Sequence, residues 1–300
     1  MSYDVVLLTE RQYIAPKKTD WYIEQVLTED RLVLEALIAK GLTVTKKDWA
    51  DPDFDWSMAK TLLFRTTWDY FHRFEEFSPW LKKVSKITTL INPAEQIRWN
   101  MDKHYLADLA AKNVPIVKSH FIPKGTAESL QEIHSKLGWK ETVIKPTISG
   151  AARHTYRLTP ENIEEHEAIL QPLIAQEDFI LQPFLHQITT KGEVSHVVIG
   201  GNYSHSILKT AKEGDYRVQD DFGGSIHLYA AGPQEIEFAE NAVKACDPQP
   251  LYARVDLVWD NDDQLALGEL ELIEPELWFR KNDKAAGKLA DAIFQTYFSN

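Results

Sequence analysis

The chain has 300 residues, of which 44% are hydrophobic and 26% charged, and its formal net charge is -12. This length predicts one large domain or two to three small ones. The negative charge argues against nucleic-acid partners, because non-specific binding depends on neutralising phosphates with Lys and Arg. The single cysteine, Cys246, excludes an internal disulfide framework and suits a reducing, cytoplasmic compartment. The N-terminus resembles no signal peptide, and no segment approaches the roughly 20 apolar residues of a membrane span.

The first third of the sequence alternates predicted strands with predicted helices. Apolar runs predict strands at Tyr3–Leu8, Leu42–Thr45, Thr61–Phe64 and Thr88–Ile91. Helical periodicity predicts helices at Glu29–Lys40 and Phe74–Lys86. Strand, helix and strand in this order favour a parallel sheet that is covered on both faces.

The rest of the chain changes from mixed to antiparallel character. The mixed part holds helices at Asn100–Lys112, around Glu128–Leu137 and at Glu161–Gln176, and strands at Ile116–Ile122, Thr142–Lys145 and Phe179–Pro183. Two hairpins follow, Glu193–Ile199 with Tyr203–Thr210 and Leu251–Trp259 with Gln264–Ile273, and helices at Gln234–Ala245 and Lys284–Tyr297. The predicted fold class is therefore α/β and α+β, in three segments at residues 1–90, 91–185 and 186–300.

A lysine ends one predicted strand and precedes a loop of small residues. Lys145 lies in the run Val143–Pro146, and Thr147–Ala152 follows. A lysine on a rigid strand end supplies a fixed positive charge, and small residues let backbone N–H groups approach phosphate oxygens. The sequence lacks the glycine-lysine pattern of a Walker-type phosphate loop. The alternative is a solvated lysine beside an ordinary turn.

Three carboxylates and an arginine lie on the second predicted hairpin. Arg254 and Asp256 share one face of their strand, as do Glu269 and Glu271 on the partner strand. Like charges on one sheet face repel each other unless a cation lies among them. Mg²⁺ prefers such oxygen ligands and commonly shares them with substrate phosphates. The alternative is an exposed sheet face that carries ordinary salt bridges.

Two further segments suggest binding surfaces. The apolar run Phe179–Leu185 could contact an adenine edge, or could be a buried core strand. The run Arg65–Tyr70 follows a predicted buried strand, which is where open α/β sheets place ligands. There Arg65 would bind a carboxylate and Asp69 an ammonium of an amino-acid-like substrate, and Trp68 would form a wall of the site. Alternatively, Trp68 packs between domains.

From about Ile91 to Arg280 the chain resembles the ATP-grasp superfamily. An ordered set of motifs carries the resemblance: Lys103, Val143–Pro146, Phe179–Leu185, Arg-x-Asp at Arg254 and Glu-x-Glu at Glu269. Within this superfamily, the chain is most similar to glutathione-synthetase-like members, in particular the ligases that form D-cycloserine. The runs that carry this closer resemblance are Arg65–Tyr70, Gly192–His196, Ser204–Lys209, Gly214–Gln219 with Gly223 and Gly224, and Glu269–Pro275.

The resemblance implies a role for each matching residue. It places Lys103 and Lys145 on ATP phosphates, Ser149 and Gly150 in a mobile loop above them, Gln182, Phe184 and Leu185 at adenine, and Glu193 at ribose. It makes Asp256, Glu269 and Glu271 the ligands of Mg²⁺ or Mn²⁺. Relatives usually carry Asn at the position of Glu271, so Glu274 is an alternative ligand. Arg217, Lys145 and Arg254 would act in phosphoryl transfer, and Lys209, Gly223 and Gly224 would contact substrate.

The predicted function is ATP-dependent ligation of a small, amino-acid-like carboxylate to an amine through an acyl phosphate. One alternative closes a ring within a single substrate. Others are a nucleotide-binding sensor without turnover and a phosphotransferase that stops at phosphorylation. The resemblance also implies a homodimer.

Overall fold

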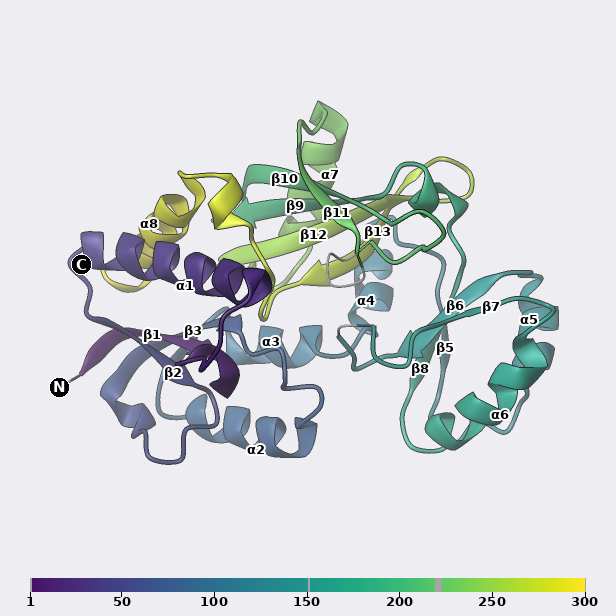
Figure 1. Ribbon diagram of the computed structural model, residues 1–300, viewed down its shortest axis with the longest axis horizontal. Coiled ribbons are helices and arrows are strands. Elements are labelled where there is room, and N and C mark those ends of the chain that lie inside the picture. The colour runs from purple at the N-terminus through teal and green to yellow at the C-terminus, as the bar shows by residue number, and fades with distance from the viewer. Residues whose placement is uncertain (1, 151, 219–222, 300) are drawn as a thin grey trace.

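The computed structural model describes residues 2–150, 152–218 and 223–299. Its N-terminal part is a four-stranded parallel sheet in the order β2-β1-β3-β4. Alternate residues of β1 face opposite sides, so Val5 and Leu7 pack with helix α1 while Val6 and Leu8 pack with α2 (Figure 1). The predicted parallel sheet with two covered faces is confirmed. The elements are β1 Tyr3–Thr9, α1 Trp21–Ala39, β2 Val44–Asp48, β3 Ala59–Thr66, α2 Phe74–Val84 and β4 Thr89–Ile91.

Helix α1 begins eight residues before the predicted start at Glu29. The side chain of Asp20 caps it by accepting hydrogen bonds from the backbone N–H groups of Tyr22 and Ile23, at 3.0 and 2.9 Å. Of residues 21–28 only Val26 is buried, so the first turns carry little of the apolar periodicity that marks the rest of the helix.

The second sheet has four strands in the order β5-β8-β6-β7, all antiparallel. Helices α5 and α6 cover one face of this sheet (Figure 1). Their apolar side chains form a separate core cluster with those of the strands. Strand β7 is absent from the sequence-based prediction. The elements are β5 His120–Ile122, α5 Leu130–Leu137, β6 Thr142–Pro146, β7 Tyr156–Leu158, α6 Ile163–Ile174 and β8 Phe179–Pro183.

The predicted single helix at Asn100–Lys112 is wrong. Two short helices, α3 (Ala94–Asn100) and α4 (Tyr105–Ala111), are separated by a turn at residues 101–104. In that turn the backbone N–H of Lys103 donates to the carbonyl of Thr147 at 2.9 Å, which anchors the turn to the end of β6. The break therefore sets Lys103 beside the small-residue loop.

The third sheet has five antiparallel strands in the order β11-β10-β9-β12-β13, and both predicted hairpins are confirmed. Gly200 and Gly201 in the first turn have φ of 58° and 77°, a region that glycine adopts readily. Strand β11 is missing from the prediction because its residues are mostly exposed and give no apolar alternation. The elements are β9 Glu193–Ile199, β10 Asn202–Thr210, β11 Ser225–Tyr229, α7 Pro233–Lys244, β12 Tyr252–Trp259, β13 Leu265–Glu271 and α8 Ala285–Tyr297.

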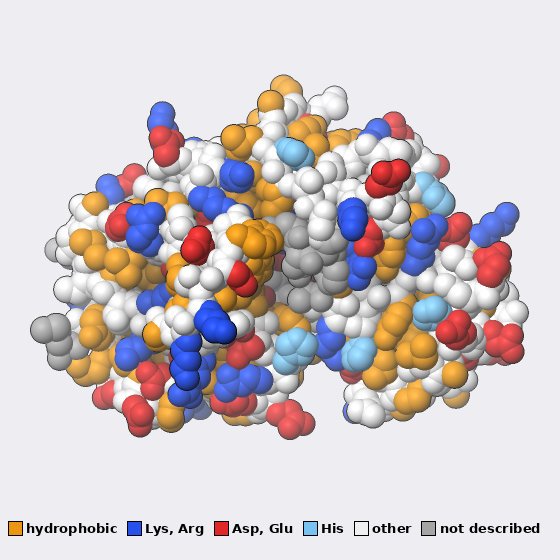
Figure 2. Space-filling model, in the orientation of Figure 1, with side chains coloured by type: hydrophobic (Ala, Val, Ile, Leu, Met, Phe, Trp, Pro, Cys, Tyr) orange, Lys and Arg blue, Asp and Glu red, His pale blue; other side chains and the backbone are white. Residues whose placement is uncertain are grey.

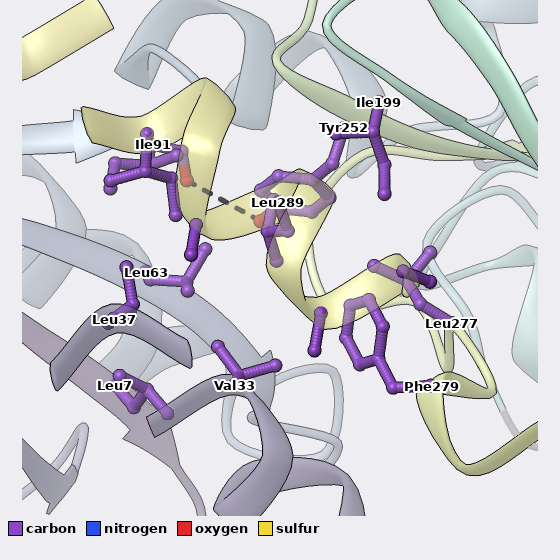
Figure 3. Close-up of a cluster of buried hydrophobic side chains, with 14 of the residues drawn as sticks. Leu7, Val33, Leu37, Leu63, Ile91, Ile199, Tyr252, Leu277, Phe279 and Leu289 are labelled. Carbon is purple, nitrogen blue, oxygen red and sulfur yellow. Dashed lines mark hydrogen bonds between the residues drawn. The ribbon is translucent and has the colours of Figure 1, made fainter. Parts of the chain in front are cut away.

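A single apolar cluster joins the first sheet to the third. Figure 3 shows Leu63 of β3 and Leu37 of α1 meeting Leu289 of α8 and Tyr252 of β12. Buried Asn92 reinforces this joint, because its side chain bonds the carbonyls of residues 252 and 272 and the N–H of residue 251 at 2.7 to 3.0 Å. These contacts fix the carboxyl end of the parallel sheet against β12 and β13.

Charged side chains of both signs are interspersed over the face drawn in Figure 2. Within the described residues, no helix combines the length and the apolar character needed to cross a membrane. The predicted segment limit at residue 90 falls inside β4, whereas the limit at 185 falls between β8 and β9. The division into three domains stays a prediction.

Candidate functional site

Three adjoining cavities form one cleft between the sheets. An apolar compartment of about 150 Å³ lies between Val143, Gln182, Phe184, Leu185 and Val258. A charged compartment of about 260 Å³ shares Lys145, Glu193 and Glu269 with it. An aromatic compartment of about 220 Å³, bounded by Trp68, Tyr70 and Phe71, shares Lys103, Arg254 and Glu271 with the charged one.

The β12–β13 hairpin sets the floor of the charged compartment. Its register places Asp256 opposite Glu269 and Arg254 opposite Glu271. The three carboxylates therefore lie together beside the arginine, as the sequence predicts. The Asp256 carboxylate accepts hydrogen bonds from Arg254 Nε at 3.0 Å and from Ser195 Oγ on the neighbouring strand at 2.5 Å. Although burial opposes it, these donors and nearby Lys209 hold the pKa of Asp256 well below its usual range. Asp256 is therefore a fixed negative charge.

Glu271 lies in a different electrostatic environment on the same face. It pairs with Arg254, but burial and the carboxylates of Asp256 and Glu269 raise its pKa to about 7. Glu269 accepts from Lys103 Nζ at 3.1 Å and lies 3.9 Å from Lys145 Nζ, and these lysines lower its pKa against the effect of burial. The two carboxylates therefore titrate in different pH ranges.

The lysines of the site come from three separate elements. Lys145 ends β6, Lys103 lies in the turn between α3 and α4, and Lys209 lies on β10 opposite Glu193, with which it forms an ion pair. Lys103 Nζ also donates to the carbonyl of Ser149 at 2.7 Å, which holds the small-residue loop close. Burial and nearby Lys103 lower the pKa of Lys145, whereas the carboxylates around it, Glu269 foremost, stabilise its charge.

Protein cations thus offset the carboxylate repulsion that the sequence predicts. Among the described residues, no group of three or more His, Cys, Asp or Glu is arranged to hold a metal ion. The carboxylates nonetheless offer the oxygen donors that Mg²⁺ prefers, on adjacent strands of one face. The metal set of Asp256, Glu269 and Glu271 stays a prediction.

The apolar compartment is lined by aromatic and aliphatic side chains together with a few polar groups. Gln182 is buried and its Nε2 donates to Ser119 Oγ at 3.0 Å. The Phe184 ring lies 3.8 Å from the Arg157 guanidinium carbon, and Tyr216 meets it edge-on. Apolar and aromatic walls with a few polar groups are typical of small-molecule and cofactor sites.

Comparisons with known proteins identify the family of this chain. Residues 5–92 match the family described as the D-cycloserine synthetase DcsG N-terminal domain. The cycloserine biosynthesis protein DcsG of Streptomyces lavendulae is 30% identical over 280 residues, which cover 87% of this chain and 91% of that protein. The chain belongs to the DcsG family of ATP-grasp ligases. Its enzymatic class is therefore that of ADP-forming carboxylate–amine ligases, and ring closure within one substrate is compatible with it.

Solved structures show the same fold for this DcsG-family chain. The crystal structure of D-cycloserine synthetase DcsG gives a TM-score of 0.85 at 28% identity and covers 97% of this chain and 98% of that one. The crystal structure of D-alanine–D-alanine ligase from Bacillus anthracis complexed with ATP gives a TM-score of 0.66 at 13% identity. It covers 99% of this chain and 97% of that chain. The ATP-grasp ligase PsnB complexed with minimal precursor, Mg and ADP gives 0.64 at 16% identity over 97% of each chain. The predicted fold class and superfamily are confirmed.

Some residues predicted for substrate binding lie elsewhere in this family member. Arg65 is 1% exposed; it donates to the carbonyl of Pro275 at 3.3 Å and its guanidinium packs over the Phe279 ring. Asp69 accepts from Trp49 Nε1 and from Arg73 Nη1, both at 2.7 Å. Neither side chain lines the three compartments, because each is committed to a protein partner outside them.

The other substrate-side predictions divide between the cleft and its surroundings. Trp68 lines the aromatic compartment, and Arg217 lines the charged one while its guanidinium pairs with Asp215 at 2.7 Å. Gly223 and Gly224 line none of the three compartments as described. Gln219, which belongs to the resemblance, lies outside the described residues.

One aromatic residue that no sequence pattern indicated, Trp278, lies beside the cations of the charged compartment. Trp278 is buried and has φ 47° and ψ 45°, a conformation that bulky residues rarely adopt. Its ring lies 5.8 Å from Lys209 Nζ and 5.4 Å from the Arg254 guanidinium carbon. Trp278 therefore supports the two cations that hold Asp256.

Proposed function

We propose that this ligase binds ATP along the cleft, with adenine in the apolar compartment and the phosphates over Lys103 and Lys145. The observation that carries this proposal is the convergence of two lysines from separate elements on Glu269, where the three compartments adjoin. Gln182, Phe184 and Leu185 would contact adenine and Glu193 the ribose. The ATP and ADP complexes of related folds support this assignment.

The carboxylates beside these lysines would hold the divalent ion. Asp256, Glu269 and Glu271 offer oxygen ligands, and Mg²⁺ or Mn²⁺ bound there would neutralise charge on the phosphates. Glu274 is less suited, because it lies beyond Glu271 in the aromatic compartment and does not line the charged one.

The proposed chemistry has two steps. An oxygen of the substrate carboxylate attacks the γ-phosphorus of ATP, the bond to the bridging oxygen breaks, and ADP leaves. The amine nitrogen then attacks the acyl carbon, inorganic phosphate leaves, and the amine loses a proton. Arg254, Arg217 and Lys145 line the charged compartment and would stabilise the charge that develops on the phosphoryl oxygens.

Water must be excluded while the acyl phosphate persists, since hydrolysis would waste it. The loop at Ser149 and Gly150 lines both the charged and the aromatic compartment, and Gly150 lies close to Phe71 in the turn after β3. This loop would close the cleft during the reaction.

The proposal is tested by phosphate release from ATP and Mg²⁺ across a panel of small carboxylates. Asp256→Ala and Arg217→Ala should each lower release at least about 100-fold, a loss typical of groups that stabilise transition-state charge. Arg31→Ala and Asp263→Ala serve as matched controls, because both residues form exposed ion pairs. Release that is unchanged in Asp256→Ala and Arg217→Ala would contradict the assignment.

Other functions give different products in the same assay. Ring closure, which the likeness to DcsG favours, would proceed without a second amine substrate. ATP binding without release for any carboxylate would instead indicate a nucleotide-binding protein, and a stable phosphorylated product a phosphotransferase. The cytoplasmic location and the homodimer stay predictions, which fractionation and sedimentation can test.

A further inference from the structure

The chain passes from the second sheet to the third through the segment between β8 and β9, residues 184–192, which we call the linker (Figure 1). Phe184, Leu185 and Ile188 of the linker line the apolar compartment. The second sheet holds its start, because the N–H of Phe184 donates to the carbonyl of Glu141 at 2.9 Å. The position of the linker therefore sets one wall of the compartment that is proposed for adenine.

One side chain of the third sheet bonds two backbone groups of the linker. Asn261, in the turn between β12 and β13, donates from Nδ2 to the carbonyl of Phe184 and accepts at Oδ1 from the N–H of His186, both at 3.0 Å. A carbonyl accepts and an N–H donates, so these partners fix the orientation of the amide. Leu185 between them is extended, with φ -90° and ψ 105°, so its own N–H points to the opposite edge of the linker. Asn261 therefore holds the linker along one edge.

The turn that carries Asn261 is itself well ordered by hydrogen bonds. The Asp260 carboxylate accepts from the N–H groups of Asp262 and Gln264, both at 2.9 Å. The backbone N–H of Asp260 donates to the carbonyl of Gln264 at 2.8 Å, which closes the hairpin. The acidic turn of the sequence is therefore a rigid support for Asn261, on the hairpin that also carries the carboxylates of the charged compartment.

Other contacts between the linker and this hairpin are less specific. Lys191 pairs with Asp263 on the surface, and such exposed pairs contribute little. The apolar contacts of Leu185 and Ile188 with the third sheet have no directional preference. Asn261 therefore supplies a directional contact that these others lack.

We propose that Asn261 is a positioning residue for the nucleotide, because it holds the linker in the place where the linker meets the adenine base. This inference rests on the proposed function, since it takes the apolar compartment as the base site. A segment that is already ordered loses less conformational freedom when a ligand binds, which raises affinity. The base is held alike before and during phosphoryl transfer, so loss of the two hydrogen bonds should raise KM for ATP and leave kcat nearly unchanged.

The experiment compares Asn261→Ala with Asn202→Ala as its matched control. Asn202 is also an exposed asparagine in a hairpin turn of the third sheet, but its Nδ2 donates at 2.9 Å to the carbonyl of Gly200 in its own turn. Calorimetric titration with ADP in the presence of Mg²⁺ should show binding about 5- to 30-fold weaker in Asn261→Ala, as expected for the loss of two ordinary hydrogen bonds. Asn202→Ala should stay within about twofold of wild type.

Amide hydrogen exchange, followed by mass spectrometry, tests the linker without any ligand. The N–H of His186 loses its acceptor in Asn261→Ala, so exchange in residues 184–188 should be at least about fivefold faster. Exchange in β8 and β9 should be unchanged, which separates a local effect from loss of the fold. In the phosphate-release assay, Asn261→Ala should raise KM for ATP by the factor seen for ADP and keep kcat within about twofold of wild type.

The outcomes separate this proposal from the ligase assignment. Faster exchange of the linker together with weaker ADP binding, in Asn261→Ala alone, would support it. Unchanged ADP binding or unchanged linker exchange in Asn261→Ala, an equal loss of affinity in Asn202→Ala, or a fall in kcat with KM unchanged would overturn it. Failure of the wild-type protein to bind ADP would instead count against the proposed function, and with it against the base site on which this proposal rests.

Discussion

Gly150 is the position where a single added methyl group should push the small-residue loop away from Phe71 in the aromatic compartment. A Cβ added there would lie 2.7 Å from Phe71 Cε1 and 3.1 and 3.2 Å from two further ring atoms. Phe71 is almost buried, with Tyr70 and His72 packed against its ring at centroid distances of 5.6 and 4.4 Å. The ring therefore has little room to withdraw, and the loop must move instead.

The cost of such overpacking is typically about 1–3 kcal/mol. If the loop contributes to ATP binding only in its closed position, Gly150→Ala should weaken ATP binding by roughly 5- to 150-fold, because each 1.4 kcal/mol is tenfold in affinity. Unfolding should change little, because an open loop relieves the clash without disturbing the core. The dissociation constant of ATP, measured by calorimetry, gives the magnitude directly.

A double-mutant cycle with Phe71→Leu separates this clash from any other effect of the methyl group. Leucine removes the ring atoms that the new Cβ would meet, so ATP binding by Gly150→Ala/Phe71→Leu should be restored to within about threefold of Phe71→Leu alone. The same loss of affinity in both backgrounds, or no loss in either, would refute the proposed coupling between Gly150 and Phe71.

Three further predictions concern stability and the cations of the site. Asn92→Ala should lower the free energy of unfolding by about 2–4 kcal/mol, because it leaves three backbone groups at the joint between the sheets without their partner. Urea unfolding measures this change, and a decrease below about 1 kcal/mol would contradict the prediction. Burial raises the pKa of Glu10 to about 7, above its unfolded value, so wild type should lose stability as pH rises from 4.5 to 7. Glu10→Gln should be more stable above pH 7 by up to about 3 kcal/mol, and unfolding curves with a pH-independent difference would exclude this cause. Trp278→Leu should lower kcat about 5- to 30-fold by removing the ring beside Lys209 and Arg254, whereas Trp278→Phe should keep most of it; equal losses would argue against a cation–π role.

Local patterns predicted the parts of the site that depend on strand register. Arg254, Asp256, Glu269 and Glu271 meet because side chains alternate along a strand and a short acidic turn joins the two strands. The strand that ends at Lys145 followed from its apolar run and the proline after it. In each case the decisive neighbours lie within about 20 residues of one another in the sequence, so a local pattern was sufficient.

Arg65 shows where such reasoning fails. Its place at the end of a buried strand is correct, but the carbonyl that accepts its hydrogen bond belongs to Pro275, 210 residues away. The alternation of side chains along the strand predicts the two faces of the sheet. It does not indicate that the segment after β13 packs against the end of the strand at Arg65. Helix α3 ends before Lys103 for a similar reason, since the turn is held by the carbonyl of Thr147 in another part of the chain.

The charge balance of the cleft explains why the sequence suggested a metal where the described structure shows ion pairs. Asp256, Glu193, Glu269 and Glu271 face Lys103, Lys145, Lys209 and Arg254, so the acidic groups already have protein partners. Under the proposed ATP assignment, a nucleotide phosphate would compete with Glu269 for its two lysines, and Glu269 would then need another cation. If ATP and a divalent ion bind as proposed, their binding would be coupled through Glu269, because each would remove the charge imbalance that the other creates.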